Sequence, residues 1–111
     1  MTKTVYLGSW RVGDLEPSLT VRLLADGEPL DISTADSASI TVGDLVDAAP
    51  ASIIDDGSEA QRGLVRYAWS SGQTSTAGLH NTEVKLTWSV GRVQTFPGDN
   101  TRALVRISAS V

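Results

Sequence analysis

The side chain with the widest chemical use in this sequence is its single histidine, His80. Histidine acts as a general base, proton relay or metal ligand near neutral pH, so any such site in this chain has to include this residue. Period-two spacing gives His80 the parity of Val84 and Leu86, which predicts a place at the rim of a buried face. No serine stands in the Gly-x-Ser-x-Gly pattern of a nucleophile elbow. We therefore expect a structural or loop histidine rather than a catalytic one.

Carboxylates are the second possible source of chemistry, and they gather in the turn 55–59 and at Asp44 and Asp47. The turn reads Asp55-Asp56-Gly57-Ser58-Glu59 and offers several oxygens that could bind Ca²⁺. It lacks the one-three-five spacing and terminal glutamate of an EF-hand loop, which favours a solvated turn. The absence of cysteine removes thiolate ligands for zinc. These patterns predict no metal, no cofactor and no catalytic residue, so we do not expect an enzyme.

The aromatic residues allow two interpretations, packing in a core or stacking against sugars. Trp69 and Trp88 share the parity of the large apolar residues in their segments, which predicts that both are buried. Trp10, Tyr6 and Phe96 remain as candidates for an exposed stacking platform. The packing interpretation predicts four core anchors, which are Tyr67, Trp69, Leu86 and Trp88.

Leucine and arginine occur together on the side of three expected strands that faces away from the predicted core. Each of Leu24, Leu64 and Leu104 has an arginine two residues away, on the same expected face. An apolar patch rimmed by positive charge is typical of protein interfaces. The alternative is that these leucines lie under loops or at strand ends. The residues predicted for an interface are Arg22, Leu24, Leu64, Arg66, Leu104, Arg106 and Trp10.

Short extended segments must position these side chains, because apolar and polar residues alternate along most of the chain. The alternation predicts strands over 4–10, 19–25, 38–42, 65–69, 83–89 and 103–109, with one short strand, 52–54, inside the weakly patterned segment 45–62. Because β-branched Val90 resists positive φ, we expect a three-residue loop at Val90-Gly91 with Gly91 left-handed. The pattern predicts an all-β, antiparallel β-sandwich of about seven or eight short strands, and a small barrel is the alternative.

Composition and charge narrow the class of protein. A length of 111 residues suits one domain over 1–111, and 41% hydrophobic with 20% charged residues predicts a globular chain. No apolar segment is long enough to cross a bilayer, so we expect no membrane partner. A net charge of -4 with scattered lysines and arginines disfavours nucleic-acid binding. The start Met1-Thr2-Lys3-Thr4 lacks the apolar stretch of a secretory signal, so any exit from the producing cell is expected to use another route.

One stretch of the chain carries a resemblance to a known family. It comprises Arg66-Tyr67-x-Trp69, the turn ending Thr76-Ala77-Gly78, the segment 83–88 and Gly91-Arg92-Val93-Gln94-Thr95-Phe96-Pro97. These motifs resemble small immunoglobulin-like domains of tailed-phage virions. Such domains are similar to the N-terminal module of phage baseplate upper proteins and to minor tail proteins of actinobacterial phages.

The resemblance implies an immunoglobulin-like fold and a structural function in a virion that is assembled in the host cytoplasm. It implies a homo-oligomer or many symmetric copies that dock on other virion proteins, in the tail or baseplate first and as capsid decoration second. The alternative function is a carbohydrate-binding or host-adhesion module, in which exposed aromatic residues such as Trp10 would hold a glycan.

Overall fold

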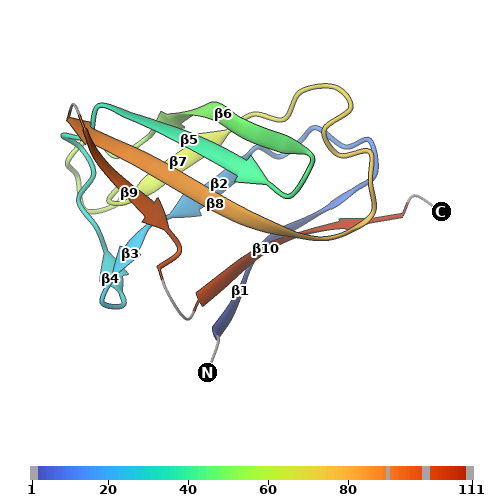
Figure 1. Ribbon diagram of the computed structural model, residues 1–111, viewed down its shortest axis with the longest axis horizontal. Helices are drawn as coiled ribbons and strands as arrows, with labels where there is room; N and C mark the ends of the chain where they lie inside the picture. Colours follow the sequence, from blue (N-terminus) through green and yellow to red (C-terminus); the bar gives the residue numbers. More distant parts are fainter. Residues whose placement is uncertain (1–2, 90, 99–100, 110–111) are drawn as a thin grey trace.

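All regular elements of this chain are strands. The computed structural model describes residues 3–89, 91–98 and 101–109, and no helix occurs among them (Figure 1). In chain order the strands are β1 (Lys3–Arg11), β2 (Leu19–Arg22), β3 (Leu24–Ala25), β4 (Glu28–Pro29), β5 (Ser37–Val42), β6 (Val46–Ile53), β7 (Leu64–Tyr67), β8 (Gly78–Ser89), β9 (Arg92–Phe96) and β10 (Thr101–Ser108). The all-β prediction is confirmed. The described residues accordingly contain no helix that is long and apolar enough to span a membrane.

Alternation of apolar and polar side chains explains the central strands. In β5, Ala38, Ile40 and Val42 are buried, and in β8, Val84 and Leu86 are buried on either side of the exposed Lys85. Successive side chains of a strand point to opposite faces, so each of these strands has one core face and one wet face. The two strands pair in antiparallel register, with their apolar residues opposite one another.

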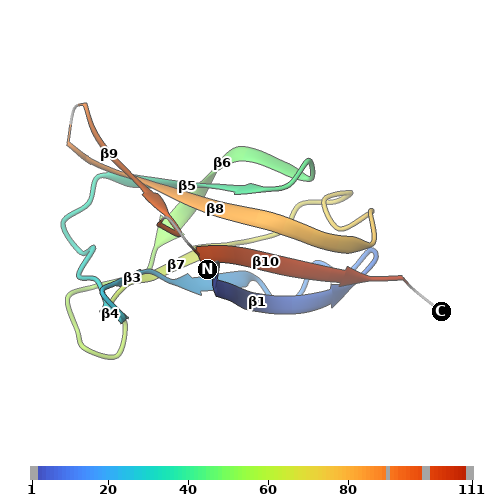
Figure 2. The ribbon, with the colours of Figure 1, turned by 60° about the horizontal axis from the view of Figure 1, so that its bottom comes forward.

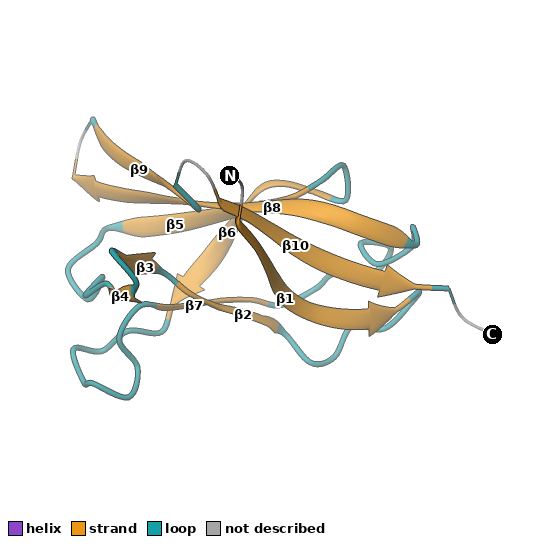
Figure 3. Ribbon diagram, turned by 90° about the horizontal axis from the view of Figure 1, so that it is seen from below, coloured by secondary structure: helices purple, strands orange, loops and turns teal. Residues whose placement is uncertain are grey.

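The sheet curls until its two ends come close together. Seven strands follow one another in the hydrogen-bonded order β1-β10-β8-β5-β6-β7-β2, and β3 and β4 form a separate hairpin. Figures 2 and 3 show the sheet wrapped around its interior, with β1 and β2 on the same side of the molecule. The result is a mixed sheet close to a barrel, nearer to the alternative architecture than to two antiparallel layers. Pairing of β1 with β10 is parallel, which breaks the predicted all-antiparallel arrangement. Period-two spacing assigns faces but not strand partners, so it does not reveal this pair.

Strand β8 pairs with two different strands along one of its edges. Its first part, Gly78 to Asn81, pairs with β10, and its second part, Val84 to Ser89, pairs with β9. Strand β5 lies along the opposite edge (Figure 1). Strands β9 and β10 therefore separate from each other below β8, and this fork opens one end of the barrel.

Strand β6 is longer than the sequence predicts. The weakly patterned segment 45–62 indicates only a short strand at 52–54, but β6 covers Val46–Ile53. Its alanines and Pro50 have poor intrinsic strand propensity. Pairing with β5 on one side and β7 on the other overrides this propensity.

The turn between β8 and β9 includes a residue outside the described ranges. This residue is Val90, and the ends of the predicted domain 1–111 also lie outside them. Gly91 has a φ of 79°, the left-handed conformation expected for it.

Three of the predicted core anchors lie in the core, and one does not. Tyr67, Trp69 and Leu86 are buried, with Leu86 at 0% exposure. Trp88 is only partly buried at the end of the β8–β9 hairpin, where its Nε1 donates a hydrogen bond to Gln94 Oε1 at 3.0 Å. The register of the hairpin shifts between Thr87 and Ser89, so the regular alternation ends before it can carry the indole of Trp88 inward.

Trp10 was predicted on the surface and is instead a core residue, 6% exposed. Its ring meets Trp69 edge to face at 5.3 Å between centroids, and its Nε1 donates to the carbonyl of Pro17 at 2.7 Å. The cause is a bulge in β1 between Tyr6 and Gly8. One extra residue exchanges the two faces of a strand, so the residues after the bulge have the opposite parity to Val5 and Leu7.

Candidate functional site

Four of the predicted interface residues gather around β2 and β7, and we call them the β2–β7 face: Arg22, Leu24, Leu64 and Arg66. Arg22 stands directly opposite Leu64 in the antiparallel pair, and Arg66 is opposite Thr20. Leu24 is 49% exposed. The guanidinium of Arg22 donates hydrogen bonds to the carbonyls of Ala60 and Arg62, at 2.8 and 3.0 Å, so it also fastens the loop before β7. Leu64 and Arg66 are thus next to a cation that is held in place.

Apart from Trp10, which is in the core, the remaining predicted residues are Leu104 and Arg106 on β10, which three strands separate from β7 in the sheet. They belong to a surface we call the β10 face: Tyr6, Leu79, Leu104 and Arg106. Arg106 is opposite Leu79 of β8, and its guanidinium carbon lies 5.9 Å from the ring centroid of Tyr6. Tyr6 and Leu79 are 59% and 52% exposed. This geometry suits a cation–π contact that holds the arginine over the aromatic ring.

Leu104 differs from its prediction, because it is only 5% exposed. It lies outside the main core cluster, on the outer side of β10, between Tyr6 of β1 and Asn81 of β8. A residue on a strand that is paired along both edges is covered by its neighbours on each side. Leu104 therefore supports the β10 face from beneath and does not itself present a contact surface.

The aromatic candidates for sugar stacking are mostly unavailable. Trp10 and Phe96 are 6% and 7% exposed, so neither presents an open ring face, and only Tyr6 of the three is exposed. The single exposed ring lies against Arg106. A stacking platform for a glycan needs accessible ring faces. The glycan-binding alternative depended on an exposed Trp10, and this residue is packed in the core instead.

His80 performs a local structural task at the start of β8. Its Nε2 lies 2.9 Å from the carbonyl oxygen of Thr76, and the ring packs beside Gly43. Partly buried, the ring contacts the turn that leads into its own strand. Among the described residues, no group of three or more His, Cys, Asp or Glu side chains comes together as a possible metal site.

Asp55 was predicted in a solvated turn, and the structure buries it instead, to 5% exposure. Its Oδ2 accepts hydrogen bonds from the backbone N–H groups of Ile32 (2.8 Å) and Gly63 (2.9 Å), and its Oδ1 accepts one from Gly57 at 2.9 Å. This single carboxylate ties the segment before β5 to both ends of the loop 55–63. An Asp-x-Gly turn is a known sequence signal for the local bond to Gly57, but nothing in the sequence signals the two distant bonds.

The hydrogen bonds decide the charge state of Asp55. Burial on its own would raise the pKa of its carboxyl group, but the N–H groups of Gly63, Ile32 and Gly57 and the positive charge of Arg62 outweigh burial and lower the pKa. Its oxygens are already bonded to backbone donors, which leaves little capacity to coordinate a cation. The pKa values of Asp31 and Asp56 are also lowered, by the hydroxyl and N–H of Ser33 and of Ser58 respectively.

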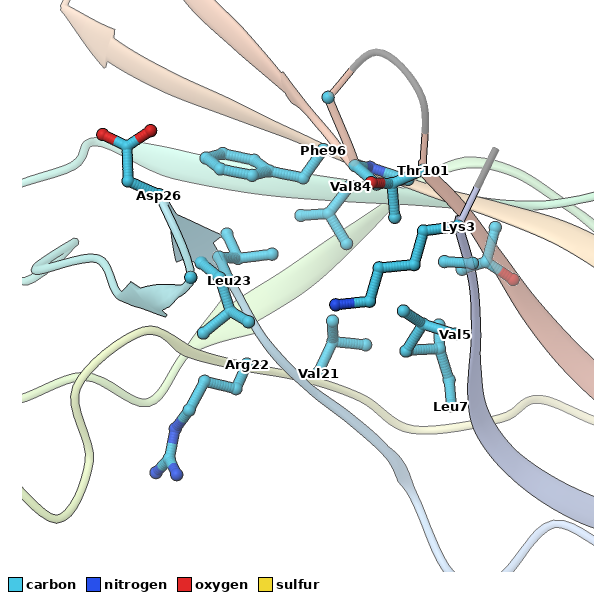
Figure 4. Close-up of a pocket in the computed structure, with 16 residues that line it drawn as sticks. Lys3, Val5, Leu7, Val21, Arg22, Leu23, Asp26, Val84, Phe96 and Thr101 are labelled. Carbon is cyan, nitrogen blue, oxygen red and sulfur yellow. The ribbon is translucent and has the colours of Figure 1, made fainter. Parts of the chain in front are cut away.

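A cavity of about 420 Å³ opens where β1 and β2 diverge (Figure 4). Its walls are the first half of β1, the end of β2 with the β3–β4 hairpin, and the fork between β9 and β10. Apolar side chains form most of the lining, among them Val5, Leu7, Val21, Leu23, Val84, Phe96 and Ala103. The side chain of Lys3 points into this space, while that of Arg22 turns away from it (Figure 4). Sequence patterns could not find this cavity, because it exists only where non-consecutive strands meet.

Comparison with known proteins gives a likeness of fold. No protein-family model and no curated protein sequence matches this chain. Among solved structures, the chain is similar to the N-terminal domain of phage TP901-1 ORF48, with a TM-score of 0.57 and 12% sequence identity. The match covers 100% of both chains, so it involves the whole fold and not a fragment. At this level of identity, the similarity shows that the two domains have a related all-β fold.

Proposed function

We propose that this chain is a structural component of a tailed-phage virion, an immunoglobulin-like module that docks on other virion proteins in the tail or baseplate. The observation that carries the proposal is the likeness of fold, over the full length of both chains, to a domain of a phage protein. The motifs around Tyr67, Trp69 and Gly91 to Pro97 support it independently, because they resemble domains of the same class of particle. The function is assembly and not catalysis.

The surface of the barrel offers two places for docking. The β2–β7 face presents Leu24 and Arg66, and the β10 face presents Tyr6, Leu79 and Arg106. Tyrosine and arginine are enriched at protein interfaces, and the exposed leucines add apolar area beside them. Many copies in a symmetric particle would add such weak contacts together into firm attachment. Two separate faces allow one copy to contact two different neighbours.

The test is to purify particles of the phage whose genome encodes this chain. Mass spectrometry of the particles should detect the chain, and cryo-electron microscopy should show its barrel repeated by the symmetry of the tail or baseplate. If the particles lack the chain while infected cells contain it, the proposal is wrong. Density on the capsid instead would keep the structural function and correct its position.

A further inference from the structure

The barrel is left open between two strands that each have an unpaired edge. Within the described residues, β1 pairs only with β10 and β2 pairs only with β7, and these two strands end the hydrogen-bonded order of the sheet. From their connection at one end of the molecule the two strands diverge (Figures 1 and 3). The cavity of about 420 Å³ fills the widening gap, between Lys3, Val5 and Leu7 on one side and Val21 and Leu23 on the other.

We propose that this cavity is a docking groove for an extended, acidic segment of a partner protein, which adds a strand to the free edge of β1. An edge strand presents unpaired N–H and C=O groups, and a peptide that pairs with them gains affinity from main-chain hydrogen bonds and specificity from alternate side chains. Here every second side chain of the added strand would enter an apolar cavity. The free edge of β2 is less suitable, because β2 has only four residues, whereas β1 has nine.

The charge of the groove defines the chemistry of the partner. Of the described lining residues, Lys3, Arg22 and Asp26 carry charge, and Figure 4 shows only the ammonium group of Lys3 directed into the cavity. Asp26 lies at the end of the cavity away from Lys3 (Figure 4). Lys3 is exposed, and its ammonium group can donate a charge-assisted hydrogen bond to a carboxylate of a strand that lies in the groove. The positive charge of Lys3 therefore favours an acidic residue at the facing position of the partner strand.

The lining predicts the pattern of the bound strand. Lys3, Val5 and Leu7 alternate along β1 and all line the cavity, so the facing positions of the partner strand should be one acidic and two apolar residues. A fatty acid would also match an apolar cavity with one ammonium group. It would, however, leave the edge of β1 unpaired, and for this reason we assign a peptide. The inference rests on the proposed function only in that the partner would be a virion protein.

The experiment titrates the ¹⁵N-labelled chain with the peptide Ac-TVTVTET-NH2 and follows backbone amide signals by NMR. We expect saturable shifts at Lys3 to Leu7 and at Val21 to Leu23, together with slower hydrogen exchange along β1. The peptide Ac-TVTVTKT-NH2 should bind at least about tenfold more weakly, because its lysine meets Lys3. The peptide Ac-TVPVTET-NH2 tests the backbone pairing, since proline removes one of the donors that the ladder needs.

The charge contact has a matched control within the chain. Lys3→Glu should weaken binding of Ac-TVTVTET-NH2 about tenfold and improve binding of Ac-TVTVTKT-NH2. Lys85→Glu changes the only other lysine, which is exposed on the outer face of β8, and should leave both affinities unchanged.

Three outcomes would overturn the inference: no saturable binding, equal binding of all three peptides, or shifts confined to the outer faces of the sheet. Saturable binding of decanoate in the cavity, with no peptide binding, would assign the groove to an amphiphile instead. Concentration-dependent dimerisation that protects β1 would assign it to a second copy. A chain that binds the peptide but is absent from purified particles would contradict the proposed function alone, whereas presence in particles without peptide binding would contradict this inference alone.

Discussion

At the scale of single residues, Asp55 is a buried carboxylate that accepts three backbone hydrogen bonds. The three N–H groups come from separate parts of the chain. Asp55→Ala would leave the N–H groups of Ile32 and Gly63 without an acceptor in a buried place. An unsatisfied buried donor costs about 1–3 kcal/mol, so Asp55→Ala should reduce the free energy of unfolding by at least that amount.

The pH dependence of stability follows from the lowered pKa of Asp55. Because the folded state holds the carboxyl group at a lower pKa than the unfolded chain, its contribution is complete above about pH 4 and is lost as pH falls through the folded pKa. Asp55→Asn should therefore lower the urea midpoint at about pH 6 and reduce its decline between about pH 6 and pH 3. The remaining decline is expected because Asp31 and Asp56 keep lowered pKa values. Asp44→Asn, an exposed site, is the control, and an equal pH slope in both variants would refute the assignment.

Gly63 is a position where only glycine fits. Its φ is 80°, and a Cβ would stand 2.7 Å from the carbonyl oxygen of Leu23. Gly63→Ala should reduce the free energy of unfolding by about 2–4 kcal/mol, since backbone strain and the clash act together. Gly72 has a similar φ of 88°, but a Cβ there would meet no atom within 4 Å, so Gly72→Ala should show only the strain, about 1–2 kcal/mol. Chemical denaturation of both variants compares the two costs, and equal losses would contradict the predicted clash.

At the scale of elements, the bulge in β1 decides which side of the strand builds the core. It turns Trp10 inward against Trp69 and leaves Gly8 directly beneath the indole. A Cβ at Gly8 would lie 2.8 Å from Cη2 of Trp10, and a packed ring cannot yield as a flexible chain end would.

Gly8→Ala should therefore displace the indole of Trp10 from Trp69 and destabilise the fold by about 1–3 kcal/mol. The measurement is the near-ultraviolet circular dichroism of the tryptophan pair, followed together with the thermal midpoint. Ser9→Ala, one residue further on at an exposed position, should change neither signal. An unaltered tryptophan signal in Gly8→Ala would contradict the close contact between residue 8 and the indole of Trp10.

At the scale of the whole molecule, the two docking faces can be distinguished by assembly. Leu64→Asp replaces an apolar group between Arg22 and Arg66 on the β2–β7 face, and Leu79→Asp does the same beside Arg106 on the β10 face. Loss of a central contact costs at least about 1.4 kcal/mol, so incorporation into particles should fall about tenfold for the face that docks. Mass spectrometry of purified particles measures it, with circular dichroism as the test of folding.

Thr95→Asp, on the exposed side of β9, is the matched control and should assemble like the unmodified chain. If all three variants fold and are incorporated equally, neither face is an interface. The groove at β1 would then be the next surface to test.

The alternation of apolar and polar residues was sufficient to predict the class of fold and much of the core. Alternation identified β2, β5, β7 and the centre of β8, and it placed Tyr67, Trp69 and Leu86 on the buried side. These conclusions are reliable because the side that a residue faces in a regular strand depends only on its immediate neighbours in sequence. The same alternation identified the leucine–arginine pairs, which the structure places on the β2–β7 face and the β10 face.

Two features became evident only in the folded chain: where the alternation of buried and exposed residues is interrupted, and which strands pair with one another. The bulge in β1 reversed the expected position of Trp10, and the parallel β1–β10 pair covered Leu104 and closed most of the barrel. Long-range hydrogen bonds buried Asp55, and the divergence of β1 from β2 created the cavity around Lys3. Each of these features joins residues far apart in sequence, and alternation contains no information about such partners.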